Sequence, residues 1–262
     1  MTVLLAFLFG LLIGSFMNVC IYRLPRNRSI VRPRSYCPQC RAMIAWYDNI
    51  PVVSYLLLGG KCRRCHRRIP LRYPLVELMT GATFALLVAG YGADLRAAKL
   101  GVMSAALIAL AFTDLSRRIL PDELTLGGLM FGLLSSILVP PYNDLIHAVL
   151  SQSMHPQMAS VTASAIGAAG PSLLIWGIAG LWARLRDLED ALGLGDVKMI
   201  AMIGSFVGLQ ASLAAMVIGS IGGSMIGMVY ILIRKKDWRT FQLPYGTYIA
   251  FGTVLFVLVR GL

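Results

Sequence analysis

Apolar residues along the chain are grouped into long runs separated by short polar connections. The runs cover residues 2–22, 74–91, 98–114, 122–140, 159–183, 197–209, 211–233 and 244–260. Most of them approach the length of about 20 residues that an α-helix needs to cross the hydrocarbon core of a bilayer. The pattern predicts an all-α polytopic membrane protein with about eight transmembrane helices, of which the helix over 197–209 is short.

The first run, residues 2–22, has the length of a secretory signal peptide. It lacks both a basic start and a cleavage site of small residues, so we expect it to be retained as the first transmembrane helix. The chain is then expected to have three parts. These are the first helix over 1–22, a soluble loop over 23–73 and a seven-helix transmembrane domain over 74–262.

The composition supports this interpretation. The 262 residues are 57% hydrophobic and only 14% charged, whereas soluble domains average about 25% charged residues. The net charge of +12 would suggest nucleic-acid binding in a soluble protein. Here the unequal charge of the two sets of loops explains it, so no nucleic-acid partner is expected.

Basic residues predict the orientation of the helices. The loop 23–73 holds twelve of the 24 Lys and Arg residues, whereas the loop 140–158 holds none. Loops rich in Lys and Arg stay in the cytoplasm. We therefore expect the loop 23–73 on the cytoplasmic side of the membrane, where its charge also attracts anionic membrane lipid.

The loop 23–73 carries two C-x-x-C pairs, CPQC at 37–40 and CRRC at 62–65. Four cysteines at this spacing predict a closed, structural Zn²⁺ site with Cys37, Cys40, Cys62 and Cys65 as ligands. A redox pair is an alternative, and disulfides are disfavoured in a reducing compartment. His66 is a further potential ligand, although four cysteines make it redundant. A metal would supply folding energy that so small a loop lacks.

Two acidic residues lie at the ends of apolar runs, where ordinary structural roles do not explain them. Asp114 ends the run 98–114, and Asp196 in GLGDVK immediately precedes the run 197–209. The predicted topology brings both to the cytoplasmic edge of the bilayer. Acids at membrane depth are costly and indicate function. We expect these two to form a catalytic pair.

Two carboxylates that face one another cannot both ionise at low cost, so one keeps a proton while the other stays charged. Such a pair performs aspartic-protease chemistry. Gly193 and Gly195, which precede Asp196, would allow close approach of the backbone. Lys198 would steer the charge of a carboxylate or extend its ammonium to the interface.

Other acids have competing explanations. Asp122 follows Pro121 at a predicted helix start, where acids complement the helix dipole, yet it stays a second candidate for the partner acid. Glu77 lies within an apolar run, where it has a functional role or forms a buried ion pair with Arg72 or Lys198. Glu189 belongs to the polar loop 184–195.

Five segments together resemble the bifunctional type IV prepilin leader peptidase/N-methyltransferases, membrane aspartic peptidases of the GxGD type. The segments are GSFMNVCIYRLP at 14–25, the cysteine-bearing stretch from CPQC to ELMTG at 37–81, FTDLSRRILPDELT at 112–125, GLGDVK at 193–198 and LPYGTYIAFG at 243–252. Met17 and Thr247 depart from the family pattern, which usually has Leu and Pro at these places.

The resemblance implies a specific function. Asp114 and Asp196 match the family's two aspartate motifs, so they would cleave the short basic leader of prepilins and pseudopilins at the cytoplasmic face of the bacterial inner membrane. Glu77, Asp122 and Glu189 would then be candidates for contact with this basic leader. S-adenosylmethionine would then donate a methyl group to the new N-terminal residue. The four cysteines are a feature of the bifunctional branch. No methyl-donor site is readable from the residues themselves.

Two other classes of function are compatible with the apolar runs. The protein would be a non-enzymatic assembly factor whose cysteine loop docks a partner, or a small transporter in which Asp114 and Asp196 relay protons or bind a cation. Both acids lie at one edge rather than at mid-bilayer, and no clear internal repeat is visible, which disfavours the transporter.

Overall fold

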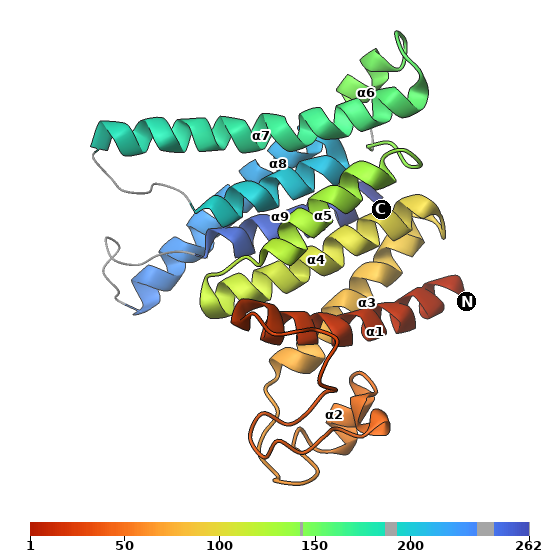
Figure 1. The fold of residues 1–262 in the computed structure, drawn as a ribbon, viewed down its shortest axis with the longest axis vertical. Helices are drawn as coiled ribbons and strands as arrows, with labels where there is room; N and C mark the ends of the chain where they lie inside the picture. Colours follow the sequence, from red (N-terminus) through yellow and green to blue (C-terminus); the bar gives the residue numbers. More distant parts are fainter. Residues whose placement is uncertain (142–143, 187–192, 235–243, 262) are drawn as a thin grey trace. The chain divides into compact units, whose positions relative to one another are not determined.

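The computed structural model describes residues 1–141, 144–186, 193–234 and 244–261. In these residues the regular structure is helical, without a β-strand (Figure 1). The helices are α1 (Thr2–Arg23), η1 (Leu24–Arg26), η2 (Trp46–Asn49), α2 (Val53–Leu57), α3 (Arg72–Tyr91), α4 (Leu95–Arg117), α5 (Asp122–Ser135), α6 (Leu145–Leu150), α7 (Pro156–Arg186), α8 (Leu194–Arg234) and α9 (Tyr245–Gly261). The expectation of an all-α fold is confirmed.

Five helices among the described residues are long and apolar enough to cross a membrane, namely α1, α3, α4, α7 and α8. The predicted count of eight spans is therefore not confirmed. α5 has 14 residues and α9 has 17. The two predicted runs 197–209 and 211–233 form one element, α8, which is interrupted at Gly208.

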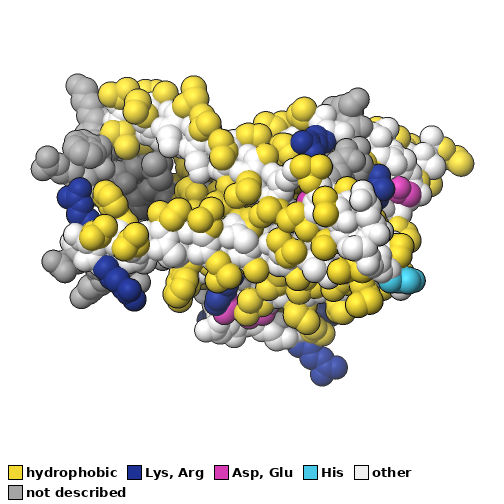
Figure 2. All heavy atoms as spheres, turned by 90° about the horizontal axis from the view of Figure 1, so that it is seen from above, with side chains coloured by type: hydrophobic (Ala, Val, Ile, Leu, Met, Phe, Trp, Pro, Cys, Tyr) yellow, Lys and Arg dark blue, Asp and Glu magenta, His cyan; other side chains and the backbone are white. Residues whose placement is uncertain are grey.

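The outward surface of these helices is apolar. α7 exposes Leu173, Leu174 and Trp176, and α8 exposes Ile221 and Met225. Figure 2 shows hydrophobic side chains spread widely over one face of the molecule, with basic side chains in small separate groups. Exposed apolar surface of this extent is typical of a protein solvated by lipid.

The chain forms two compact units, and α4 belongs to both. The first comprises Met1–Ala109 with the chain end from Arg260, and the second comprises Leu110–Val259. In the first unit α1 packs along α3, and the residues between these helices form a small module that contains η2 and α2. In the second unit α8 packs against both α5 and α7.

Glycines set the distance between packed helices in both units. A Cβ on Gly10 of α1 would lie 2.8 Å from the Cα of Gly81 in α3. In the second unit, a Cβ on Gly167 of α7 would lie 2.6 Å from the carbonyl oxygen of Gly204 in α8. Small residues at such crossings let backbones approach closely, which drives association of helices in lipid.

The break in α8 has a defined partner. Gly208 adopts φ 81° and ψ −178°, a conformation that only glycine adopts readily. The carboxylate of Asp144, which is 4% exposed, accepts a hydrogen bond from the N–H of Leu209 at 3.4 Å and one from Ile146 at 3.1 Å. One side chain therefore satisfies both the break in α8 and the start of α6.

The close crossing of α1 and α3 predicts that one methyl group added at Gly10 lowers the stability of the protein. We expect Gly10→Ala to lower the melting temperature of the detergent-solubilised protein, because overpacking costs about 1–3 kcal/mol and here the obstacle is backbone. Gly127→Ala in α5 is the matched control, since nothing lies within 4 Å of a Cβ there. It should be neutral or stabilising, because Ala favours helix by about 1 kcal/mol over Gly. Equal melting temperatures for the two variants would contradict this packing.

Candidate functional site

Asp114 lies in the last turn of α4, within the second unit, and its side chain is only 7% exposed. Its Oδ2 accepts two hydrogen bonds from Thr247 in the first turn of α9. The backbone N–H donates at 2.8 Å. The hydroxyl donates at 2.9 Å, and its single proton is shared with the carbonyl of Ala111 at 3.1 Å. One oxygen of this buried carboxylate is thus held by two donors from a residue 133 positions away in the chain.

Asp196 lies in the first turn of α8 and is partly buried. A carboxylate in this position is favoured by the helix dipole. Of the two glycines before it, Gly195 packs closely, because a Cβ there would lie 3.2 Å from the Cβ of Leu120. Gly193 accepts a hydrogen bond from the Asp196 N–H at 3.0 Å. Gly195 thus lets α8 begin tightly against the segment before α5.

The two carboxylates face the same point on α9. A Cβ built on Gly246 would lie 3.0 Å from Oδ1 of Asp196 and 3.2 Å from Oδ2 of Asp114. The carboxylates are close enough for their charges to interact. A Cβ at residue 246 would press against both carboxylates, so the glycine leaves the space in which they meet. The C-terminal end of α4 and the N-terminal ends of α8 and α9 build this site.

Asp122 and Lys198 form an ion pair near the start of α5. The Lys198 Nζ donates to both carboxylate oxygens of Asp122, at 2.8 and 2.9 Å. The side chains of Asp122 and Lys198 are 57% and 35% exposed respectively. The sequence-based interpretation of Lys198 as a cation that steers a carboxylate therefore has a concrete partner, although that partner is Asp122 rather than Asp114 or Asp196.

Two residues at this site were not singled out as site residues by sequence. Gly246 and Thr247 appeared only within the motif LPYGTYIAFG, and Thr247 appeared only as a departure from a family pattern. Their roles depend on contacts with residues that are distant in the chain, which the local pattern does not contain. Glu189 lies outside the described residues.

The four cysteines come together in the first unit. One ligand atom from each lies within 4.8 Å of the others, and the Sγ atoms of Cys37 and Cys65 are 3.8 Å apart. This cluster could hold a metal ion. All four are free thiols, as is Cys20, which is buried in α1.

The two C-x-x-C pairs have the same backbone geometry. The Cys37 N–H donates to the carbonyl of Ala42, and the Cys62 N–H donates to the carbonyl of Arg67, both at 2.9 Å. Arg41 and His66 occupy equivalent left-handed positions, with φ 57° and 54°. His66 therefore completes a turn, and the four-cysteine group does not include it.

The thiols influence one another strongly. The backbone N–H groups of Cys65 and Arg64 lower the pKa of Cys62 to about 7. The Arg67 N–H acts in the same direction on Cys65, but desolvation and hydrogen bonds with the other thiols outweigh it and raise the pKa of Cys65 to about 11. Charge on one sulfur thus keeps the proton on its neighbour, and a bound cation would remove this conflict.

Glu77 of α3 is also buried in the first unit, with 7% of its surface exposed. Its Oε2 accepts a hydrogen bond from the Val52 N–H at 2.8 Å. The sequence left open an ion pair of Glu77 with Arg72 or Lys198, and among the described residues Glu77 forms neither pair. Arg72 has a buried Nε without a partner, and Lys198 pairs with Asp122.

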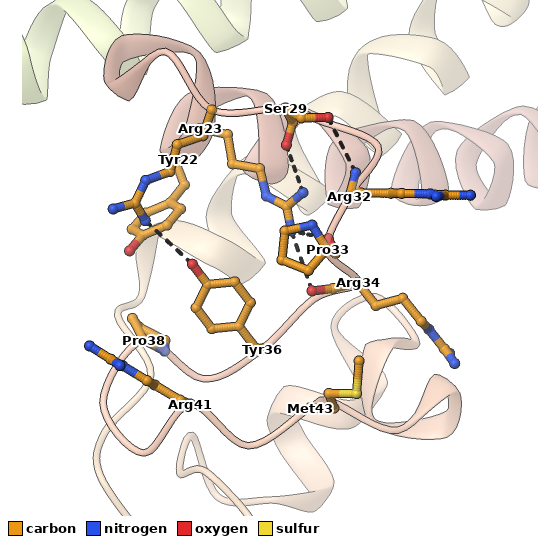
Figure 3. Close-up of a pocket in the computed structure, with 11 residues that line it drawn as sticks. Tyr22, Arg23, Ser29, Arg32, Pro33, Arg34, Tyr36, Pro38, Arg41 and Met43 are labelled. Carbon is orange, nitrogen blue, oxygen red and sulfur yellow. Dashed lines mark hydrogen bonds between the residues drawn. The ribbon is translucent and has the colours of Figure 1, made fainter.

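A cavity of about 800 Å³ opens beside the end of α1 and is lined by five arginines, Arg23, Arg28, Arg32, Arg34 and Arg41. Figure 3 shows that Arg23 turns back into the loop, where it donates to the carbonyls of Ser29 and Pro33 at 2.8 and 2.7 Å. Arg32, Arg34 and Arg41 extend outward from the loop (Figure 3). This cavity favours anions and disfavours a basic peptide.

The cysteine cluster predicts a specific metal content. The purified protein should hold about one metal ion per chain, and Cys37→Ser should release it, because one of four thiolate ligands is lost. Cys20→Ser is the matched control and should retain the metal. Elemental analysis by mass spectrometry measures both. Equal metal content in the two variants would rule out the cluster as the metal site.

Comparisons with known proteins cover most of the chain. The family model described as Bacterial Peptidase A24 N-terminal domain matches residues 8–91, and that described as Type IV leader peptidase family matches residues 101–228. No solved structure matches the chain.

Several relatives carry the name prepilin leader peptidase/N-methyltransferase, among them the following three. The protein from Aeromonas salmonicida is 34% identical, over 94% of this chain and 87% of its own length. That from Pseudomonas aeruginosa is 31% identical, over 95% and 87%. That from Myxococcus xanthus is 35% identical over 88% of this chain, which spans 63% of the relative. With both family models in order along it and relatives above 30% identity over most of its length, the chain belongs to the type IV leader peptidase family.

Proposed function

We propose that this protein cleaves the basic leader peptide of prepilins and pseudopilins and then methylates the new N-terminal residue with S-adenosylmethionine. The observation that carries the proposal is the meeting of Asp114 and Asp196 at Gly246. A carboxylate pair is sufficient for peptide hydrolysis without a covalent intermediate. The names of the relatives support both the prepilin substrate and the methyl transfer.

In the proposed mechanism the two acids have different roles. Asp114 Oδ2 accepts two hydrogen bonds from Thr247, and donors to a carboxylate favour its ionised form. Asp114 therefore takes a proton from the attacking water. Asp196 provides a proton to the scissile carbonyl as the water oxygen bonds to carbon. The tetrahedral intermediate then expels the amine, which leaves with a proton returned by the pair.

The substrate meets this pair at the membrane boundary. Asp114 ends α4 and Asp196 begins α8, so both lie at helix ends rather than at mid-bilayer. The excess of Lys and Arg in the loop 23–73 supports a cytoplasmic location for that loop. With α5, α9 and two halves of α8 as short spans, eight crossings of an inner membrane would put the pair on the same side.

The cysteine cluster is proposed to bind Zn²⁺. Four thiolates in paired turns are the donor set of structural zinc sites. With Zn–S distances of about 2.3 Å, neighbouring sulfurs in a tetrahedron are roughly 3.8 Å apart, which agrees with the 3.8 Å between Cys37 and Cys65. All four positions around the ion would be taken by protein, so its role would be structural.

The acid candidates for leader contacts differ in their availability. Asp122 already holds Lys198, so a basic leader would compete with a lysine for it. Glu77 interacts with the Val52 N–H and the Ser15 hydroxyl, which are neutral donors and leave its charge for a cation. Glu189 stays a candidate by sequence alone.

The carboxylate pair predicts the phenotype of conservative substitutions. Asp114→Asn and Asp196→Asn should each reduce cleavage of a prepilin by at least about a thousandfold, as loss of one member of a cooperating catalytic unit does. Glu123→Gln, an exposed acid in the first turn of α5, is the control and should cleave normally. The measurement is the shift of prepilin to mature pilin in detergent or lipid. Normal cleavage by Asp114→Asn would overturn the mechanism.

Thr247 predicts a graded effect on catalysis. Thr247→Val keeps the shape of the side chain but loses the hydroxyl donor to Asp114, and hydrogen bonds to charged groups contribute about 1.5–3 kcal/mol. We expect kcat to fall roughly tenfold or more with little change in KM, and Thr247→Ser to retain the parental kcat. If Thr247 had only a structural role, the Val and Ser variants would have the same kcat, or the substitutions would change KM instead.

A further inference from the structure

A second cavity in the first unit, of about 450 Å³, lies between the module that follows α1 and the facing ends of α1 and α3. This volume is in the range of sites for small organic ligands. Ser15 and Asn18 of α1, Tyr73 and Glu77 of α3, and Tyr47 and Tyr55 of the module line it. All of its lining residues fall between residues 15 and 77, so it is formed within one unit.

An unmet hydrogen-bond acceptor lines this cavity. The Asn18 side chain is 2% exposed and its Nδ2 donates to the carbonyl of Tyr73 at 2.9 Å. Its Oδ1 is buried and has no partner. Rotation of the amide would put that oxygen against the Tyr73 carbonyl, so the hydrogen bond fixes its orientation. A buried acceptor without a donor costs free energy, and a ligand with an N–H group would satisfy it.

A buried carboxyl group accompanies this acceptor. Glu77 lines the same cavity and accepts from the Val52 N–H, and in the part of the chain that the structure describes it makes no ion pair with Lys or Arg. Buried charges are usually paired. The cavity is therefore suited to a cationic ligand that carries hydrogen-bond donors.

The walls of the cavity indicate the rest of the ligand. Tyr22, Tyr36, Tyr47, Tyr55 and Tyr73 supply aromatic surface, on which a flat heterocycle stacks and over which a cation is attracted. Five arginines line the cavity too, namely Arg23, Arg63, Arg64, Arg67 and Arg68. Arg64 and Arg67 are among those that are exposed, so a carboxylate of the ligand would find a partner there. A ligand with an aromatic base, a positive centre and an amino-acid end matches these features.

We infer that this cavity binds S-adenosylmethionine, with Glu77 facing its cationic methionine portion, Asn18 accepting from one of its N–H groups, and the tyrosines around its adenine. The inference rests on the proposed methyltransferase function and assigns a site to it. When bound, the sulfonium supplies the methyl group. The cavity of Figure 3 is less suited, because no Asp or Glu is among the described residues that line it, whereas Glu77 and Asp48 line the second cavity beside its arginines.

The metal cluster forms part of the same wall, since Cys37 and Cys62 both line the cavity. Asp48, held by Arg63 at 2.6 Å, lines it as well. The Arg63 guanidinium lowers the pKa of Asp48, so this carboxylate stays charged, and its pair with Arg63, which also lines the cavity, is neutral overall. The turns around the cysteines thus shape the space into which the ligand fits.

Direct binding tests the inference. Calorimetry on the full-length protein in detergent would measure the affinity for S-adenosylmethionine and for S-adenosylhomocysteine, which lacks the sulfonium charge. Glu77→Gln should lower the affinity for S-adenosylmethionine at least about tenfold, since a buried charge-assisted contact is lost, and should lower the affinity for S-adenosylhomocysteine less. Asn18→Leu should lower the affinity for both compounds. Glu123→Gln should change neither, and metal content and melting temperature verify that each variant is folded.

The outcomes separate this inference from the proposed function. Parental affinity in folded Glu77→Gln and Asn18→Leu, together with methylation of a cleaved pilin by the parent, would overturn the site and leave the function intact. A rise in the KM for prepilin in Glu77→Gln with unchanged S-adenosylmethionine binding would assign Glu77 to the leader instead. A parent protein that neither binds the donor nor methylates would refute the methyltransferase function itself.

Discussion

The missing side chain at Gly246 is the constraint on which the candidate site depends. The ends of α4, α8 and α9 converge there, and a single Cβ would lie within 3.2 Å of both Asp114 and Asp196. The neighbouring residue then fixes one of the two acids, because Thr247 donates twice to Asp114. Gly246 thus provides the space for both carboxylates, and Thr247 makes the surroundings of the two acids different. These are consecutive residues at the start of α9. Each residue is effective only because three distant segments meet at that point.

The same reliance on small residues runs through the helical packing. Gly10 against Gly81, and Gly167 against Gly204, bring backbones closer than any side chain would allow. Lipid tails offer no hydrophobic drive for helices to associate, so close backbone contact has to provide the attraction. The apolar side chains instead cover the outside, where Leu173 is exposed. A soluble protein would arrange these residue types the other way round.

Local patterns were enough to identify some features and not others. The apolar runs located the helices, and the spacing of Cys37, Cys40, Cys62 and Cys65 indicated a cluster that the fold does assemble. The runs 197–209 and 211–233 placed a division within two residues of the break at Gly208, but they did not reveal that Asp144 binds the backbone there. The partner of Lys198 and the environment of Glu77 were also inaccessible, because both depend on which helix faces which. Long-range contacts carry this information.

The paired turns around the cysteines have a consequence for how two ligands would influence each other. Arg41 and His66 both adopt left-handed backbone angles, which cost a non-glycine residue about 1–2 kcal/mol, and ligation of the adjacent thiols would offset that cost. Because Cys37 and Cys62 also line the 450 Å³ cavity, the two binding equilibria share the same segment of backbone. If the bound ion changes the affinity for the small molecule by some factor, thermodynamic linkage then requires the bound small molecule to change the affinity for the ion by the same factor.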